Sequence, residues 1–294
     1  MSSSQNKQLS IVTVTYNSSQ HIVTLLKSLY KEKDLIKEII IIENDSPDKK
    51  VTKININKFI AQNKALKIKF INNKSNDGFA KSCNAGARLS SGKYILFINP
   101  DTELTESSLK ILLSHADNHG ADIMGGMVRK NTHGRHNTVV RNPDFIIGLL
   151  EFTNLGKLFG TNYGHDKFYY IDTPRVYDAK NDVNVDAVGG AYILVKNSSF
   201  QLLRGFDERF FIYLEDVDLG VRANKMGLKV MYCPHSAILH EGGASSKNKF
   251  RIMHKAWYDS RKKYFLKHSN LTINMVIQVL FIIEEYMLKK IRPS

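Results

Sequence analysis

Three carboxylates occur within four residues, at Glu215, Asp216 and Asp218, directly after an aromatic-rich segment at residues 206–213. Carboxylates beside an apolar wall are candidates for a catalytic base, because burial and neighbouring negative charge raise the pKa of a carboxylate. The alternative is an ordinary helix start, because the helix dipole favours acidic side chains in the first turn. The cluster alone leaves both interpretations open.

Polar residues also follow four predicted strands in the first half of the chain. Residues 9–15, 38–42, 68–72 and 94–98 are short apolar or β-branched runs typical of buried parallel strands, and helical patterns separate them. This alternation predicts an α/β fold, whose ligands bind at the carboxyl ends of the strands. No G-x-G-x-x-G motif follows any of these strands, which argues against a dinucleotide site. The polar residues that we expect at this edge are Tyr16, Asn17, Glu43, Asn44, Asp45, Asp77, Asn99 and Asp101.

The composition is that of a globular protein. Its 294 residues are 43% hydrophobic, enough for one large domain or a domain with an appendage. Cys83 and Cys233 are the two cysteines, and they form no C-x-x-C motif. The first eight residues lack the apolar core of a signal peptide, so we expect a reducing, cytoplasmic location.

The net charge of +14 is unevenly placed, since residues 247–294 hold eleven Lys or Arg and three acidic residues. Within this tail, residues 271–283 form an apolar run that is shorter than the roughly 20 residues needed to span a bilayer. We therefore expect a helical, basic and amphipathic extension that lies on an anionic membrane surface. The alternative is packing of this helix on the protein's own core or on the partner in a homodimer.

Residues 125–182 lose clear periodicity and gain Gly, Asn, His and Tyr, with an aromatic cluster at residues 168–170. We interpret them as a long insertion with some helix that shapes the acceptor side of a substrate site, since a structureless loop of that length is unusual. Residues 185–195 are again strand-like. The pair Gly189 and Gly190 within them permits close approach of the backbone.

The order of these motifs resembles that of family 2 glycosyltransferases, most of all bacterial rhamnosyltransferase-like members. The resemblance extends over residues 9–246, and the block from Gly205 to Leu219 is its most specific part. It implies a GT-A fold, with a mostly parallel sheet flanked by helices, for residues 1–246, followed by the tail. It also implies an inverting single displacement with a nucleotide-diphosphate sugar as donor and a divalent metal, Mg²⁺ or Mn²⁺.

The resemblance implies roles for individual residues. Asp216 matches the catalytic base, with Glu215 beside it. Asp101 matches the second acid of the family's Asp-x-Asp metal motif, in which Asn99 replaces the first acid. His240 matches a histidine that binds the metal in part of the family.

Other positions match the nucleotide site of the family. Arg222 is a candidate for contact with the diphosphate, although an ion pair with Asp218 four residues earlier is the simpler explanation. The residues implied to hold the nucleotide are Thr15, Tyr16, Asn17, Glu43, Asn44, Asp45, Asp77, Gly78 and Lys81.

We therefore expect a transferase that adds a sugar, from dTDP-rhamnose or a UDP-hexose, to a polysaccharide or a lipid-linked glycan during cell-surface polysaccharide synthesis. Its expected place is the inner face of the cytoplasmic membrane, to which it is attached peripherally. A catalytically silent binder of sugar nucleotides is an alternative that Asn99 leaves open. Nucleic acid is not an expected partner, because the basic charge is confined to the tail and no nucleic-acid motif accompanies it.

Overall fold

The computed structural model describes residues 7–130, 136–153, 176, 178–240 and 250–291. Its centre is a mostly parallel sheet in the order β3-β2-β1-β4-β10-β6-β11-β5, with β8 paired to β11. Strands β1 to β4 are parallel neighbours, β10 is antiparallel to β4 and β6, and β11 is parallel to β6. The strands are β1 (Leu9–Thr15), β2 (Ile36–Glu43), β3 (Ile68–Asn72), β4 (Tyr94–Ile98), β5 (Thr102–Leu104), β6 (Ile123–Lys130), β8 (Val183–Asn184), β10 (Tyr192–Lys196) and β11 (Val230–His240).

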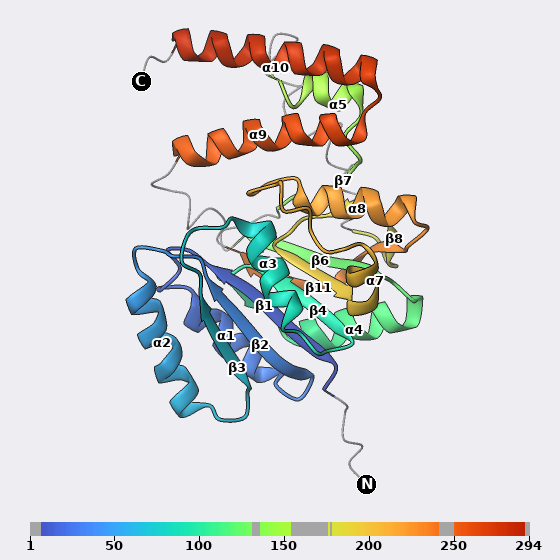
Figure 1. Cartoon of the computed structure of the whole chain (residues 1–294). Coiled ribbons are helices and arrows are strands. Elements are labelled where there is room, and N and C mark those ends of the chain that lie inside the picture. The colour runs from blue at the N-terminus through green and yellow to red at the C-terminus, as the bar shows by residue number, and fades with distance from the viewer. Residues whose placement is uncertain (1–6, 131–135, 154–175, 177, 241–249, 292–294) are drawn as a thin grey trace.

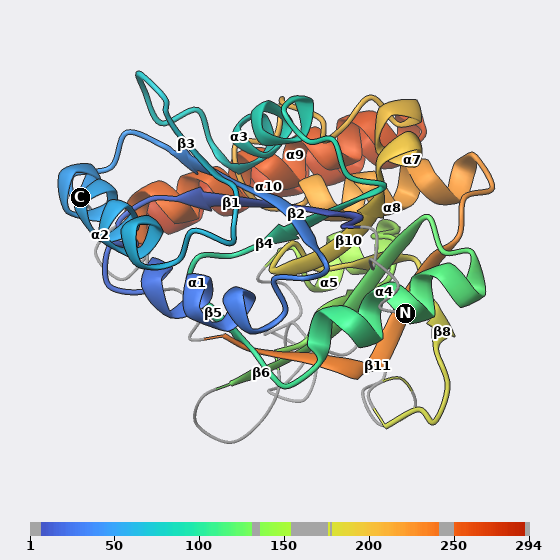
Figure 2. The ribbon, with the colours of Figure 1, turned by 90° about the horizontal axis from the view of Figure 1, so that it is seen from below.

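Helices cover both faces of this sheet, as Figure 2 shows. Alternate residues of β2 illustrate why, because Ile39 and Ile41 are buried on one face and Ile40 and Ile42 on the other. A strand buried on both faces must be apolar throughout, which explains the continuous apolar runs in the sequence. One face packs against α1 (Ile22–Lys31), α2 (Lys49–Gln62) and α4 (Ser108–His119), and the other against α3 (Phe79–Arg88), α7 (Asn197–Leu202) and α8 (Glu215–Lys225).

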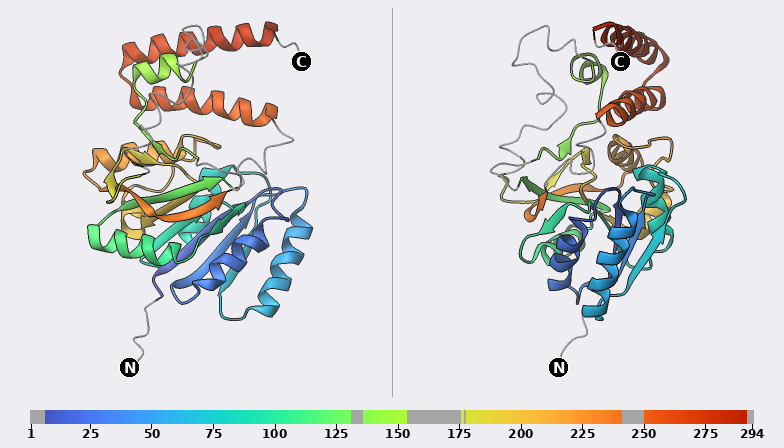
Figure 3. Two further views of the ribbon diagram at one scale, coloured as in Figure 1. Left: turned by 180° about the vertical axis from the view of Figure 1, so that it is seen from behind. Right: turned by 90° about the vertical axis from the view of Figure 1, so that its left-hand side faces the viewer.

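A further layer lies beyond α8 and consists of α5 (Phe145–Leu150), α9 (Phe250–His268) and α10 (Leu271–Ile291) (Figures 1 and 3). Phe265 of α9 and Phe281 of α10 are fully buried in an apolar cluster that this layer forms with residues of α8. Arg261 is 1% exposed, pairs with Glu284 of α10 at 2.7 Å and donates to the carbonyl of Phe152. The tail is therefore helical and packs on the protein's own core through its inner face.

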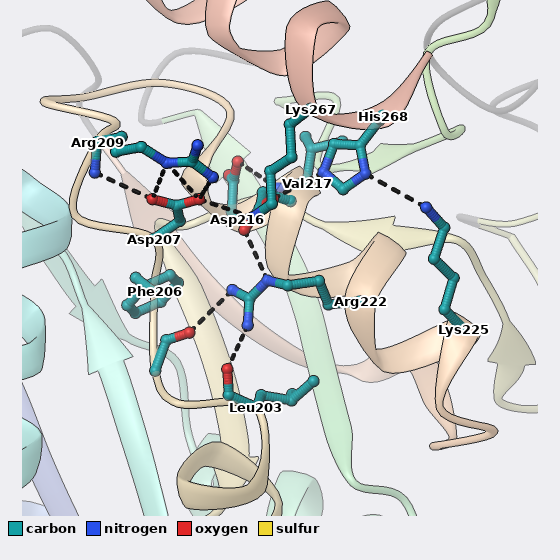
Figure 4. A network of polar contacts seen from close by, with 12 residues as sticks. Leu203, Phe206, Asp207, Arg209, Asp216, Val217, Arg222, Lys225, Lys267 and His268 are labelled. Atoms are coloured by element: carbon teal, nitrogen blue, oxygen red, sulfur yellow. Dashed lines mark hydrogen bonds and ion pairs between the residues drawn. The ribbon is translucent and has the colours of Figure 1, made fainter. Parts of the chain in front are cut away.

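A cluster of charged and polar side chains fastens α9 to α8 (Figure 4). The buried carboxylate of Asp218 lies 2.5 Å from Lys267 Nζ and 2.7 Å from His268 Nε2, both on α9. Its second oxygen lies 2.8 Å from Arg222 Nε on the same helix. Lys267 also pairs with Asp207 at 2.7 Å. The contact between the two helices therefore depends on charge as well as on apolar packing.

Several boundaries differ from the sequence-based expectations. Residues 125–130 belong to the central strand β6, so an insertion cannot begin at Gly125. The predicted strand at residues 185–195 is two strands, β9 (Ala187–Val188) and β10, separated by Gly189 and Gly190. After β4, residues 102–104 form the short strand β5, which pairs with β11, before α4 begins at Ser108. The aromatic cluster at residues 168–170 lies outside the described residues.

The apolar run at residues 271–283 is part of α10. None of the helices in the described part of the chain combines the length and apolar character needed to cross a bilayer. Ile277 and Phe281 face the protein's interior, whereas Val279, Ile282 and Ile283 are 49–59% exposed. The helix therefore has two apolar faces, of which one is covered.

Candidate active site

A pocket lies at the carboxyl end of β4, where the segments that follow β3 and β4 meet the segments that precede β10 and α8. Its walls come from the turn after β4, the glycine turn between β9 and β10, the start of α8 and the tail helix α9. The wall residues that matter here are Asn99, Gly190, Tyr213, Asp216 and Trp257. The pocket thus brings together the two parts of the chain that the sequence assigned to donor and acceptor.

Asp216 is held in this pocket by two backbone N–H groups. Its Oδ2 accepts a hydrogen bond from Gly190 N at 2.7 Å, and its Oδ1 accepts one from Val217 N at 2.8 Å. Burial raises the pKa of the Asp216 carboxyl above its usual value, and the two N–H groups limit the rise. A fixed, partly exposed carboxylate with a raised pKa has the properties of a general base.

Glu215 also lines the pocket but is more deeply buried than Asp216. It is 4% exposed, and its Oε2 has no hydrogen-bond partner. Burial, together with the negative charge of Asp216, raises the pKa of Glu215 well above 4.5. The residues before it, Tyr213 and Leu214, have φ values of 73° and 66°. Such left-handed residues are strained and occur where a site fixes the direction of the chain, here at the entry to α8.

Asn44 organises the donor-side loops at the ends of β2 and β3. Its amide nitrogen donates to Asn76 Oδ1 at 2.8 Å, and its amide oxygen accepts from Asp77 N at 3.0 Å and from Asn73 Nδ2 at 3.0 Å. The side chain is 3% exposed. Asn44 therefore shapes the loop that contains Asp77 and Gly78.

Thr15 and Glu43 are both completely buried, in contrast to the expected direct contact with a nucleotide. Thr15 Oγ1 donates to Glu43 Oε2 at 2.7 Å, and Ser46 N donates to Glu43 Oε1 at 2.8 Å. Both oxygens of the Glu43 carboxylate thus accept hydrogen bonds from within the protein. The geometry therefore favours a role for Thr15 and Glu43 in positioning the loop after β2. Tyr16 and Asn17 are partly exposed beside them, and Asn17 is left-handed with a φ of 52°.

The loop after β3 touches the acceptor-side loop before α8. Phe79 N donates to Phe211 O at 2.7 Å, and a Cβ at Gly78 would lie only 2.4 Å from that same oxygen. Gly78 also has a φ of 81°, so both the backbone conformation and the lack of space for a Cβ require glycine here. Asp77 pairs with Lys81 at 3.2 Å, and Asp45 pairs with Lys49 at 2.5 Å.

The structure brings the three predicted metal-site residues together. His240 Nε2 lies 3.1 Å from Asp101 Oδ1 and 3.5 Å from Asn99 Nδ2. Hydrogen bonding and charge from His240 lower the pKa of Asp101 despite the opposing effect of burial. The carboxylate and imidazole can offer one oxygen and one nitrogen to a divalent ion. Their metal-binding role stays a prediction.

Arg222 does not face the pocket, contrary to its expected contact with the diphosphate. Its Nε pairs with Asp218, while Nη1 and Nη2 donate to the carbonyls of Leu203 and Gly205 at 2.5 and 2.8 Å (Figure 4). All three nitrogens have partners within the protein. The i, i+4 ion pair is the correct interpretation.

Sequence reasoning missed two residues near the site. Trp257 of α9 lines the pocket beside Tyr213, with ring centroids 5.9 Å apart. His136 lies against His240, with ring centroids 5.1 Å apart, and burial lowers its pKa. Neither stands in a recognisable motif. The one available signal was an isolated tryptophan on the apolar face of the tail helix.

The buried Glu215 generates a prediction about stability. Because its folded-state pKa is raised, its contribution to stability is complete below about pH 4.5 and is lost as the pH rises through the folded-state pKa. Glu215→Gln should therefore raise the free energy of unfolding at neutral pH, and this gain should vanish below about pH 4.5. Urea denaturation over a pH series measures it, with the exposed Glu106→Gln as control. A gain that is independent of pH would contradict this origin.

Comparison with known proteins identifies the family of this chain. The sequence profile of Glycosyl transferase family 2 matches residues 10–179. An N-acetylglucosaminyl-diphospho-decaprenol L-rhamnosyltransferase of Mycobacterium tuberculosis is 25% identical over 255 residues, 81% of this chain and 77% of that protein. The rhamnosyltransferase WbbL of Escherichia coli is 28% identical over 152 residues, 50% of this chain and 52% of that protein.

Solved structures share the fold at low identity. The mannosyltransferase PcManGT from Pyrobaculum calidifontis, in complex with GDP-Man and Mn²⁺, has a TM-score of 0.60 at 15% identity, covering 88% of this chain and 63% of that chain. TarS of S. aureus has a TM-score of 0.55 at 15% identity, covering 97% and 73%. The family match spans more than half of the sequence. The chain therefore belongs to glycosyltransferase family 2 and is a rhamnosyltransferase-like enzyme with a GT-A fold.

Proposed function

We propose that this enzyme transfers rhamnose, by inversion, from dTDP-rhamnose to a lipid-linked glycan, with a UDP-hexose as the alternative donor. The observation that carries the chemistry is the Asp216 carboxylate, fixed in a pocket that Asn99 also lines. The relatives' names support the sugar and the acceptor, since one of them transfers L-rhamnose to a diphospho-decaprenol-linked N-acetylglucosamine.

In the proposed reaction, Asp216 takes the proton of the acceptor hydroxyl. The hydroxyl oxygen then bonds to the anomeric carbon while the bond from that carbon to the diphosphate breaks on the opposite face. The raised pKa of Asp216 suits it to hold the proton, and its two backbone hydrogen bonds keep it from rotating away. Tyr213 and Trp257 offer aromatic surface to the acceptor sugar.

The donor side of the same cleft would hold the nucleotide. Asp101 and His240 would hold a divalent ion, with Asn99 beside them, and that ion would neutralise charge on the departing diphosphate. A set of one carboxylate and one imidazole favours Mn²⁺ over Mg²⁺, which prefers oxygen ligands alone. Tyr16, Asn17, Asp45, Asp77 and Lys81 are the proposed donor contacts, on loops that Asn44 and Glu43 hold in place.

The base assignment is tested by Asp216→Asn. Transfer from dTDP-rhamnose to a lipid-linked acceptor should fall by about 10²–10⁴-fold, the usual contribution of a general base. Binding of dTDP, measured as thermal stabilisation, should persist, and the exposed Asp34→Asn should keep full activity. Transfer near the wild-type rate would refute the base assignment. Wild-type protein that binds donor without turnover would instead support the silent sugar-nucleotide binder.

The donor and metal assignments are tested together by thermal stabilisation with dTDP-, UDP- and GDP-sugars. For the true donor, Mn²⁺ should add to the stabilisation in the wild-type protein, because bound ligand raises apparent stability by mass action. Asp101→Asn and His240→Gln should lose the Mn²⁺-dependent part while retaining the part seen without metal. A Mn²⁺ effect of unchanged size in both variants would show that the ion binds elsewhere.

We also propose that the uncovered apolar face of α10 rests on the cytoplasmic membrane, where a lipid-linked acceptor is found. This face consists of large apolar side chains at helical spacing, all of them exposed. They are Leu271, Met275, Val276, Val279, Ile282, Ile283, Tyr286 and Met287. Burial of such a face in the interfacial region of a bilayer is favourable, and the basic residues of the tail favour anionic lipid.

The triple variant Val279→Ser, Ile282→Ser and Ile283→Ser tests this, because none of the three side chains is part of the core. Sedimentation with vesicles containing phosphatidylglycerol should fall at least about tenfold, since each buried side chain contributes roughly 1.5 kcal/mol or more. Val51→Ser with Ile54→Ser on α2 is the matched control, being equally exposed and apolar. Unchanged vesicle binding refutes the proposal. Self-association without lipid, lost in the triple variant, would assign the face to a homodimer.

A further inference from the structure

A group of metal-ligating side chains lies outside the active site. His115 and His119 are on α4, and Asp182 is on the segment that leads into β8. Asp182 Oδ2 is 2.8 Å from His115 Nδ1 and 3.2 Å from His119 Nε2. One ligand atom from each of the three residues lies within 4.8 Å of the other two. The Asp182 side chain is completely buried, so the group is built into the fold on one side.

This group and the active site lie at opposite ends of β11. β8 pairs with β11 at Met231 and Tyr232, whereas His240 is the last residue of that strand. At about 3.3 Å per residue, the distance along the strand from Tyr232 to His240 is roughly 26 Å. Figure 2 shows α4 and β8 near the start of β11. The group therefore has no contact with the donor or the acceptor of the proposed reaction.

We propose that His115, His119 and Asp182 form a structural site for a zinc-type divalent transition metal. Two histidines at i and i+4 of a helix point to the same side and can bind one ion. Zinc–nitrogen bonds are 2.0–2.1 Å long, so ligand atoms around a tetrahedral ion are about 3.3 Å apart. The two distances between histidine and Asp182 are already close to this value. The ligand nitrogens of the two histidines lie within 4.8 Å of each other, and they would have to come within about 3.3 Å to complete the triangle.

Neighbouring residues supply the surroundings that such a site needs. The buried thiol of Cys233 lies beside the Asp182 carboxylate and interacts with its charge. The ring of His235 lies 5.6 Å from the ring of His115, and its Nε2 is 3.0 Å from the carbonyl of Lys180. A carboxylate held by a second group is typical of metal ligands. Water or His235 would occupy the fourth position on the exposed side.

Without a metal, His115 Nδ1 is in hydrogen-bond contact with Asp182, and His119 Nε2 lies 3.2 Å from the same carboxylate. A bound ion would take the lone pair of each of these nitrogens, so each neutral ring would carry its proton on its other nitrogen. Two nitrogen ligands select zinc and similar ions over Mg²⁺. The ion would join α4 to the segment before β8, two elements separated by more than 60 residues, and would stabilise the folded state by mass action.

Zinc titration of the full-length protein, freed of metal by a chelator and carrying no histidine tag, tests the proposal. The wild type should bind one equivalent at this site and show a raised Tm. Asp101→Asn with His240→Gln, which removes the proposed catalytic ligands, should keep that equivalent. His115→Gln with His119→Gln should lose both the equivalent and the rise in Tm. His254→Gln on α9 is the control and should behave as the wild type.

Cobalt provides a second measurement, because tetrahedral Co²⁺ with these ligands absorbs visible light and the signal should disappear with the same two histidines. The single variant His119→Gln guards against misfolding, since that side chain is 46% exposed, and it should weaken zinc binding without changing the circular dichroism spectrum. Equal zinc binding by the wild type and the double histidine variant would overturn the proposal. So would loss of the equivalent in the variant of Asp101 and His240.

Discussion

The carboxylate of Asp218 joins the helix that carries the proposed base to the C-terminal helices, and the shape of the site depends on this junction. It is fully buried among Arg222, Lys267 and His268, which come from two helices. Removing any partner of such a group leaves buried charge without compensation, which is strongly destabilising. The junction therefore fixes α8 and α9 relative to each other. Asp216 and Trp257 consequently lie on walls of one pocket.

The fold was predictable where each signal was local. Apolar runs such as residues 94–98 specify buried strands, and parallel strands must end at one edge, so polar residues like Asn99 and Asp101 had to meet there. For the acidic cluster, the sequence left base and helix cap open, and the structure shows how the three carboxylates differ. Asp218 is ion-paired and fully buried, Glu215 is 4% exposed, and Asp216 is the least buried of the three.

The features that the sequence did not predict depend on contacts between distant segments. Gly125 and Gly126 looked like loop residues, yet they lie in β6, where a side chain is excluded because a Cβ would come within 2.6 Å of Val188 or Tyr192. Glycine in a strand marks such close approach, and its cause is invisible in the local sequence. Trp257 reaches the pocket because ion pairs and apolar packing together hold its helix against α8. The burial of Glu43 likewise follows from Ser46 and Thr15, which turn its carboxylate inward.

The contact between Gly78 and Phe211 has a consequence for any attempt to redesign this enzyme. The loop proposed to hold the donor and the loop before the proposed base share the hydrogen bond from Phe79 N to Phe211 O, and no side chain fits between them. The two loops therefore form a single structural unit. A donor loop taken from a relative would fit the neighbouring loop of that relative rather than this one. It must therefore be exchanged together with residues 210–214.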